Sequence, residues 1–227
     1  MAESVIPMFS LENIYRLPFV QRILVERRRN RARFLLSKVR QRPGMSILDV
    51  GCGTDGNSLE SELPSDYTIT GIDLLDPEEV HISHARFQYL RQDARDLSRF
   101  ADKQFDLAVS VGMMEHICNR TVLEQIASEI DRVSQQYVIV VPWKYAWLEP
   151  HFKLPFFQLL PCSLQRELTK LFNLQNYAAF VEADPEQFAQ HFQEHYQWLS
   201  DSEWRQVFKG SRVHLNPTLE SISIVKT

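Results

Sequence analysis

The sequence predicts an α/β protein built on a doubly wound, mostly parallel sheet, and two observations carry this prediction. Short uninterrupted apolar runs alternate with helical patterns along residues 46–142, which is typical of strands that helices cover on both faces. Three of the seven glycines fall between residues 51 and 56, directly after the first apolar run. A chain of 227 residues is long enough for one such domain with an insertion.

Residues 1–44 are predicted to form a basic helical arm, in which Pro18 begins a long helix and Pro43-Gly44 ends the helical region. The first 42 residues hold ten Lys or Arg and three Asp or Glu, whereas the other 185 hold 15 and 26. The arm either packs on the sheet with its arginines in water or binds an anionic partner, such as a phosphorylated lipid or sugar or a membrane surface. Nucleic acid is not expected, because no aromatic residues alternate with the arginines.

Residues 45–142 are expected to be the Rossmann-like core and to supply five parallel strands. The apolar runs that predict these strands are 46–50, 67–73, 86–90, 105–111 and 137–141. A short helix is expected over residues 57–63, and a longer one is expected to begin at a capping box from Thr121 to Glu124. Residues 74–85 are polar and leave little room for a helix between the second and third strands.

Residues 199–227 are predicted to complete a seven-stranded sheet with a helix and two more strands. A capping box from Ser200 to Glu203 begins the helix. The two runs that follow, 211–215 and 219–226, are joined by a connection too short for a parallel crossover. The last strand should therefore be antiparallel.

Residues 143–198 do not fit the strand and helix alternation and are predicted to form an aromatic cap inserted after the fifth strand. Fifteen of the 25 aromatic residues lie at or beyond Trp143. A connector this long is usually functional, so we expect it to cover the carboxyl ends of the strands. The side chains expected to face a pocket there are Trp143, Tyr145, Trp147, His151 and Phe152.

The turn after the first strand contains Gly51, Gly53 and Gly56, which is the spacing of a dinucleotide fingerprint, and Asp73 follows about twenty residues later. Asp49, two residues before the first glycine, would repel the pyrophosphate of a nicotinamide or flavin cofactor. S-adenosylmethionine has no phosphate and carries an ammonium and a sulfonium, so an acidic strand end suits it better. A nicotinamide-dependent oxidoreductase remains as a less favoured alternative.

The pieces ILDVGCG, TGID, RQDARDL and FDLAVSVGMMEHI, in this order, resemble the motifs of the class I S-adenosylmethionine-dependent methyltransferases. Together they cover roughly residues 46–142. The resemblance implies S-adenosylmethionine as the cofactor and methyl transfer as the activity. Residues 143–161 also resemble bacterial members linked with glycan or lipid-linked sugar assembly, which implies a sugar, a lipid-linked molecule or another small molecule as the acceptor.

The resemblance also implies which residues bind the cofactor. Gly51 and Gly53 let the turn approach the methionine portion closely, and Asp73 accepts hydrogen bonds from the ribose hydroxyls. Asp93 is expected to accept one from the adenine amino group, while the backbone N–H of Ala94 meets the ring. The complete expected set is Asp49, Gly51, Cys52, Gly53, Asp73, Leu74, Asp93, Ala94, Val111 and Gly112.

One departure from the family pattern concerns the turn, where Asp55 occupies the usual position of the third glycine and Gly56 follows it. An extra carboxylate near the carboxylate of the cofactor could weaken binding. A non-catalytic module that binds S-adenosylmethionine and recognises a protein through its cap is therefore kept as a second hypothesis.

Three residues near the strand ends are candidates for catalysis: Glu115, His116 and His151. Glu115-His116 matches a pair that is frequent after the fourth strand of the family and is often structural. His151 follows the fifth strand, and its neutral form could take a proton from a hydroxyl acceptor. The competing interpretation of His151 is a histidine that only packs within the cap.

The sequence gives no sign of a metal site, a disulfide framework or a membrane span. His81 and His84, and likewise His191 and His195, have metal-like spacing but lack a convincing third ligand. The three cysteines are widely spaced, which favours a reducing compartment. No apolar run is long enough to cross a bilayer and the start does not resemble a secretory signal, so a cytoplasmic protein is expected.

Overall fold

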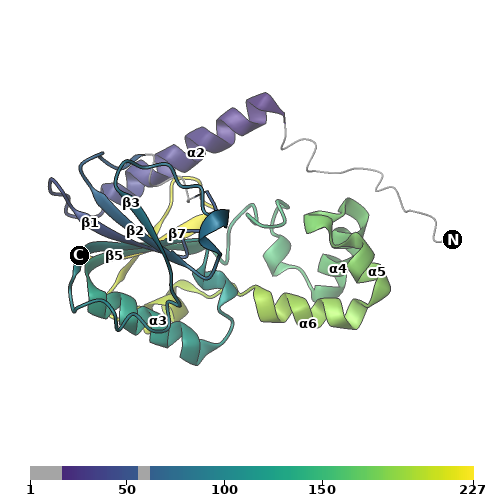
Figure 1. Ribbon diagram of the computed structural model, residues 1–227. Coiled ribbons are helices and arrows are strands. Elements are labelled where there is room, and N and C mark those ends of the chain that lie inside the picture. The colour runs from purple at the N-terminus through teal and green to yellow at the C-terminus, as the bar shows by residue number, and fades with distance from the viewer. Residues whose placement is uncertain (1–16, 56–61) are drawn as a thin grey trace.

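The computed structural model describes residues 17–55 and 62–227, and its centre is a seven-stranded sheet (Figure 1). The strands lie in the order β3-β2-β1-β4-β5-β7-β6. β1 to β5 pair in parallel, whereas β7 pairs antiparallel with both β5 and β6. The strand bounds are β1 Ser46–Val50, β2 Thr68–Asp73, β3 Phe87–Arg91, β4 Phe105–Val111, β5 Ser134–Pro142, β6 Arg212–Leu215 and β7 Ser221–Lys226. The predicted fold class is confirmed.

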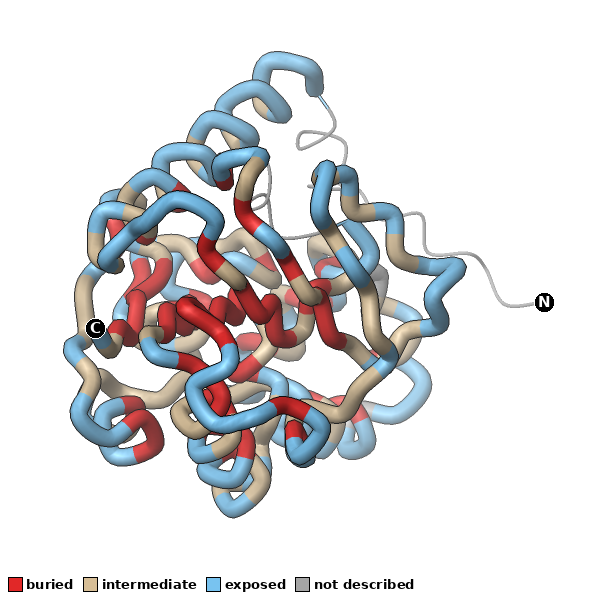
Figure 2. Tube along the Cα trace, turned by 60° about the vertical axis from the view of Figure 1, so that its left-hand side comes forward, coloured by how far each residue is buried: buried red, intermediate tan, exposed pale blue. Residues whose placement is uncertain are grey.

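Helices cover the two faces of the sheet and bury two separate cores. α2 (Pro18–Leu36) packs on one face, whereas α3 (Arg120–Val133) and α7 (Asp201–Val207) pack on the other. Figure 2 shows the strands buried in the middle and the outer sides of the helices exposed. β4 is buried along its whole length, as expected for a central strand of a sheet that is covered on both sides.

The ends of the helices follow the local sequence with two differences. α7 begins at the predicted capping box, in which the Ser200 side chain accepts from the N–H of Glu203. The box predicted at Thr121 is wrong: α3 begins at Arg120, and the Asn119 side chain caps it by accepting from the third N–H of the helix. α2 ends at Leu36, well before Pro43-Gly44. Asparagine competes well with threonine as an N-cap, which explains the earlier start.

The segment between β2 and β3 contains only the short 3-10 helix η2 (Pro77–Glu79), in agreement with the prediction for residues 74–85. The helix predicted over 57–63 falls mostly on residues 56–61, outside the described part of the chain. Within that described part, no helix has both the length and the apolarity that crossing a membrane requires.

The chain between β5 and α7 forms a helical cap with its own apolar core, beside the sheet in Figure 1. Its helices are η4 (Phe157–Leu159), α4 (Cys162–Phe172), η5 (Leu174–Asn176), α5 (Ala178–Ala183) and α6 (Pro185–His195). The core is mainly aromatic, and the rings of Phe152 and Phe157 stack with their centroids 4.5 Å apart. The aromatic residues of this segment thus bury one another.

Candidate active site

Two cavities lie at the carboxyl ends of the parallel strands, where the strand order reverses between β1 and β4. Ligands of open α/β sheets bind at this edge. The smaller cavity has a volume of about 330 Å³ and the larger one about 600 Å³. The turn from Gly51 to Gly53 separates them, because Gly51 lines the smaller and Gly53 the larger.

The smaller cavity collects the residues predicted for the nucleoside part of the cofactor. Its lining includes Asp73, Asp93 and Ala94, and also Leu74 and Gly51, although Gly51 was predicted to lie at the methionine portion. The rest of the described lining is mainly apolar and is supplied by Ile72, Met113, Ile117, Val122 and Ile126, with Gln92 and Arg95. An apolar slot with carboxylates at its edge suits an adenine ring and a ribose.

Asp73, at the end of β2, lines the smaller cavity and also holds the glycine turn by a hydrogen bond. Its Oδ2 accepts from the N–H of Gly53 at 2.9 Å, and its Oδ1 accepts from the N–H of Leu74 at 2.7 Å. A carboxylate has about four lone-pair sites, so two remain for ribose hydroxyls. The arrangement is compatible with the predicted role.

Asp93 is held more tightly than the sequence suggested, because Arg95 contacts both of its oxygens. The N–H of Arg95 donates to Oδ1 at 2.8 Å, while Nε and Nη2 of the same residue donate to Oδ2 at 2.8 and 2.5 Å. These hydrogen bonds hold the pKa of Asp93 below its usual value. One acceptor position is left on Oδ1, which is enough for a single adenine amino group.

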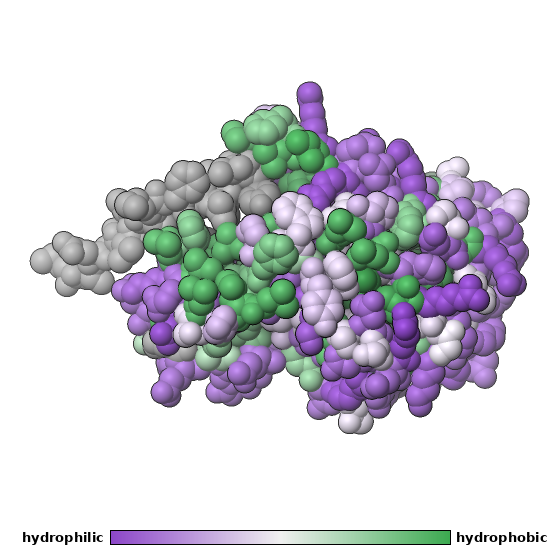
Figure 3. All heavy atoms as spheres, turned by 180° about the vertical axis from the view of Figure 1, so that it is seen from behind, coloured by the Kyte–Doolittle hydropathy of each residue, from purple (hydrophilic) through white to green (hydrophobic). Residues whose placement is uncertain are grey.

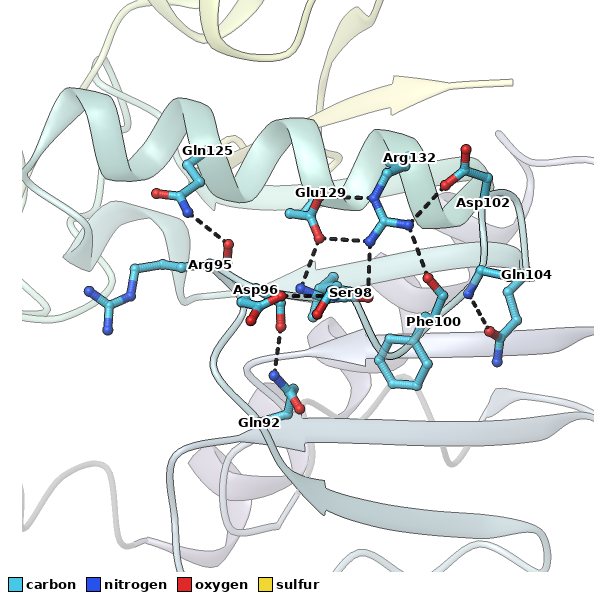
Figure 4. A network of polar contacts seen from close by, with 12 residues as sticks. Gln92, Arg95, Asp96, Ser98, Phe100, Asp102, Gln104, Gln125, Glu129 and Arg132 are labelled. Atoms are coloured by element: carbon cyan, nitrogen blue, oxygen red, sulfur yellow. Dashed lines mark hydrogen bonds and ion pairs between the residues drawn. The ribbon is translucent and has the colours of Figure 1, made fainter.

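A polar network under α3 fixes the loop that carries Asp93 (Figure 4). Arg132 donates to the backbone carbonyls of Leu97 and Phe100 and to the side chain of Glu129. Glu129 in turn accepts from the N–H of Leu97 at 2.8 Å, and Gln125 donates to the carbonyl of Arg95. The loop is therefore anchored on α3 by charged groups, and hydrogen bonds to charged groups are the stronger ones.

The turn itself depends on glycine at position 51. Gly51 has φ +74°, and a Cβ built there would lie 2.5 Å from Sδ of Met113. Gly53 has φ +68° and open space where a Cβ would stand. Open space above Gly53 is compatible with a close approach of a ligand to the backbone, which stays a prediction. The glycine turn and the two cavities fit S-adenosylmethionine, with its nucleoside on one side and its methionine portion on the other.

The larger cavity collects most of the remaining predicted residues. Cys52, Gly53, Val111, Gly112, Glu115 and His151 all line it. Asp49 is buried on β1 and does not appear among the described lining of either cavity. Direct contact between Asp49 and the cofactor therefore remains a prediction.

His151 is oriented by Glu149, a residue that the sequence analysis missed. Glu149 is fully buried, and its Oε1 lies 2.8 Å from Nδ1 of His151. The same carboxylate accepts from the N–H of Phe152 at 2.6 Å and from Nε1 of Trp198 at 3.3 Å. A carboxylate can only accept, so in the neutral ring Nδ1 would carry the proton and Nε2 would keep its lone pair. The sequence EPH held this signal, since an acid two residues before a candidate base is a natural orienting group.

Two opposing effects act on the pKa of His151. Burial favours the neutral ring and lowers the pKa. The hydrogen bond to Glu149 and the charges of Glu149 and Glu115 favour the imidazolium, and they outweigh burial, so the pKa of His151 is raised. Nε2 of His151 lies 3.7 Å from Oε1 of Glu115. Burial raises the pKa of Glu115 to about 7, and its Oε2 has no hydrogen-bond partner among the described residues. These are features of a candidate acid–base site.

His116 lies beside this pair but outside the described lining of the larger cavity. Its Nδ1 lies 2.7 Å from the carbonyl of His195, and its ring meets those of His151 and Tyr196 edge to face. One ligand atom each from Glu115, His116 and His151 lie within 4.8 Å of one another. A divalent cation could fit that spacing, so the expectation of no metal stays untested.

The predicted contribution of the cap aromatics is mostly wrong. Of Trp143, Tyr145, Trp147, His151 and Phe152, only His151 lines the larger cavity. Phe152 belongs to the core of the cap, and Tyr145 and Trp147 are 51% and 45% exposed. The aromatic residues pack on one another because the segment is long enough to bury its own core.

Comparison with known proteins agrees with the geometry. Residues 48–140 match a family described as a methyltransferase domain. A stretch of 91 residues is 34% identical to the cyclopropane-fatty-acyl-phospholipid synthase of Escherichia coli, and the match covers 37% of this chain and 22% of that protein. The chain thus matches only about a fifth of the length of these curated relatives.

Solved structures share the fold over most of the chain. A possible exported protein from Bordetella parapertussis has a TM-score of 0.55 at 18% identity, covering 92% of this chain and 69% of the other. A S-adenosylmethionine-dependent methyltransferase from Aquifex aeolicus has a TM-score of 0.52 at 14% identity, covering 86% and 87%. At these identities the likeness concerns the fold.

The strand order and the glycine turn between two cavities fit the fold of an α/β methyltransferase. With the family match, residues 48–140 belong to the class I S-adenosylmethionine-dependent methyltransferases. The cofactor of this class is S-adenosylmethionine.

Proposed function

We propose that this protein transfers a methyl group from S-adenosylmethionine to a hydroxyl oxygen of a small-molecule acceptor bound in the larger cavity. The observation that carries the proposal is the pair His151–Glu149: His151 lines the cavity that begins at the cofactor turn, and Glu149 contacts its Nδ1, which leaves Nε2 for the acceptor. When bound, the cofactor supplies an electrophilic methyl group on a sulfonium. Methyl transfer depends mainly on holding the acceptor in line with that methyl group.

The residues of this chain would do three things in the reaction. Gly53 and Asp73 hold the cofactor at the turn, while Val111 and Gly112 line the space beside its methionine portion. Nε2 of His151 takes the proton of the acceptor hydroxyl as the new carbon–oxygen bond forms and the carbon–sulfur bond breaks. Because Glu149 accepts from Nδ1, it stabilises the imidazolium that results.

Glu115 supports the same step from the other side of His151. Its Oε1 lies 3.7 Å from Nε2, so a charged Glu115 stabilises the imidazolium after proton transfer. His116 contacts the ring of His151 edge to face and acts as a packing neighbour. In this proposal His151 is the base, and Glu115 and His116 are positioning residues.

Among the possible small-molecule acceptors, we favour one that is linked to a lipid. Large apolar side chains are exposed on α2 and on the cap, among them Phe19, Ile23, Trp147 and Phe156. Figure 3 shows apolar side chains gathered over these two parts of the molecule. An apolar surface of this kind suits an acceptor with an acyl or isoprenoid chain. A curated relative acts on fatty acyl phospholipids by its name, which adds support.

The test uses His151→Gln, with His214→Gln on the edge strand β6 as the matched control. First, calorimetry measures binding of S-adenosylhomocysteine to all three proteins, and we expect affinities within twofold. Release of S-adenosylhomocysteine is then followed with a panel of hydroxyl acceptors, including sugar phosphates and phospholipid vesicles. Loss of the base should lower turnover by about 10²-fold or more.

Two results would contradict the proposal at different points. If the wild-type protein does not bind S-adenosylhomocysteine, the assigned class of activity is wrong. If it binds the ligand and His151→Gln turns over an acceptor as fast as the wild type does, His151 is not the base.

A further inference from the structure

Five of the six arginines of α2 fall into two groups with different surroundings. Arg27 pairs with Glu220, and Arg29 and Arg33 both contact Glu62 at 3.4 Å. These three arginines bind the acidic body of the protein, as the packing-helix interpretation requires. The other group, Arg28 and Arg31, lies one helical turn apart on the face of α2 that lines the larger cavity.

Arg28 and Arg31 have no counter-ion of their own among the described residues. The acids that line the same cavity are Asp55, Glu115 and Glu220, and neither arginine forms an ion pair with any of them. Arg27 already takes the charge of Glu220, and Glu115, whose pKa is about 7, is only partly ionised at neutral pH.

Arg31 carries the stronger signal of the two arginines. Burial, and then the neighbouring charge of Arg28, lower the pKa of Arg31, and the charges of Glu220 and Glu115 oppose this only in part. An arginine nevertheless stays protonated in a protein. A desolvated guanidinium is costly unless an anion pairs with it, so the cavity is built to receive one.

We propose that Arg28 and Arg31 form a subsite for a phosphate group on the methyl acceptor. This inference rests on the proposed function and names the chemical class of its substrate. Two guanidinium groups match the charge of a phosphate and can each offer it paired N–H donors. The amino acid end of the cofactor is a zwitterion, and its ammonium would be repelled by a second guanidinium.

The position of the subsite fits the reaction. Arg31 reaches the cavity from α2, whereas His151 reaches it from the segment after β5, and the two share a space of about 600 Å³. That volume accommodates an acceptor in addition to the methionine portion of the cofactor. An acceptor anchored through its phosphate at α2 would present a hydroxyl toward His151.

The experiment measures phosphate binding to the full chain saturated with S-adenosylhomocysteine. Calorimetry uses sodium pyrophosphate and glycerol 3-phosphate as free phosphates, and a sedimentation assay uses phosphatidylcholine vesicles with and without phosphatidic acid. The variants are Arg28→Gln and Arg31→Gln, with Arg22→Gln as the control because Arg22 is an exposed arginine of the same helix outside the described cavity lining.

We expect pyrophosphate to bind the wild type and Arg22→Gln alike. Arg31→Gln should weaken that binding about 10- to 100-fold, the scale of hydrogen bonds to a charged group, and Arg28→Gln should weaken it less. Arg31→Lys keeps the charge and loses the planar fork, so it should fall between the wild type and Arg31→Gln. It also tests the site if Arg31→Gln does not fold. Binding to free phosphates or only to phosphatidic acid vesicles identifies which source carries the group.

Three results would overturn the inference. The first is a wild-type protein that binds none of the phosphate probes. The second is an equal loss of phosphate affinity in Arg22→Gln, which would mean that the probes are attracted by the total positive charge of the helix. The third is a loss of S-adenosylhomocysteine affinity in Arg31→Gln with phosphate binding unchanged, which would assign the arginine to the cofactor carboxylate. If instead S-adenosylhomocysteine never binds but Arg31→Gln still abolishes phosphate binding, the proposed function fails and the subsite stands.

Discussion

Replacing Glu149 by glutamine should lower the stability of the protein and also remove the charged acceptor that orients His151. The buried carboxylate accepts from Nδ1 of His151 at 2.8 Å, from the N–H of Phe152 at 2.6 Å and from Nε1 of Trp198 at 3.3 Å. Glutamine keeps the shape, but one of its two ends is an NH₂ group that cannot accept. At least one buried N–H then loses its partner, and the others lose a charged acceptor.

The magnitude follows from these contacts. A hydrogen bond to a charged group contributes about 1.5–3 kcal/mol, and an unsatisfied buried donor costs about 1–3 kcal/mol. We therefore expect Glu149→Gln to lower the free energy of unfolding by about 2–4 kcal/mol, measured by urea denaturation. Glu167→Gln is the control, because Glu167 lies exposed on α4 and, among the described residues, pairs only with its neighbour Arg166. It should change stability by less than about 0.5 kcal/mol.

The effect should depend on pH with a definite sign. Glu149 helps to raise the pKa of His151 in the folded protein, so the charge interaction stabilises the fold below the unfolded histidine pKa. That contribution is lost as pH rises through the folded pKa. The stability difference between the wild type and Glu149→Gln should shrink over this range. In the variant, burial should lower the pKa of His151, which an NMR titration measures. Equal stability of the two proteins together with an unchanged pKa would refute this reasoning.

The remaining predictions concern the cofactor side. Asp73→Ala should weaken S-adenosylhomocysteine binding by about 1.5–3 kcal/mol in calorimetry, and unchanged affinity would remove Asp73 from the site. Gly51→Ala should destabilise the protein by more than about 2 kcal/mol in urea denaturation. The new Cβ would lie 2.5 Å from Sδ of Met113, and an alanine would have to adopt φ +74°. Gly210→Ala is the control, because Gly210 has φ +77° and open space where a Cβ would stand. It should cost about 1 kcal/mol for the backbone conformation alone. Equal losses of stability in the two variants would show that the clash with Met113 contributes nothing. Arg132→Met should lower stability by about 2–3 kcal/mol in urea denaturation, and no loss would mean that the loop is held by other contacts.

Much of the fold could be predicted because the central strands are buried on both faces. β1 and β4 coincide with the predicted runs 46–50 and 105–111, since a strand covered on both sides is a nearly continuous apolar run. The antiparallel pairing of β6 with β7 followed from the connection between them, which is too short for a parallel crossover. Helix ends were less predictable, and Asn119 shows why: two candidate N-caps stood two positions apart, and the helix begins at the stronger one, asparagine, instead of at the predicted Thr121.

The acceptor side of the site could be predicted only in part, because its residues are defined by tertiary contacts. Glutamate is rarely buried, so the spacing in EPH could suggest Glu149 as a partner of His151, but its burial follows only from tertiary contacts. Arg28 looks like Arg27 and Arg29 in the sequence. Only the rotation of α2 on the sheet decides which arginine meets an acid and which lines a cavity.

The structure divides the proposed site between two kinds of scaffold, and this division predicts a functional consequence. Asp73 and the glycine turn belong to the strand ends of the sheet, whereas Arg31 and His151 come from α2 and the cap, which pack outside it. Residues on the sheet are held by the hydrogen-bonded ladder and by the core on both faces. Substitutions in α2 or the cap should therefore alter which acceptor binds while leaving cofactor affinity intact. A protein built this way can change its acceptor without rebuilding its cofactor site.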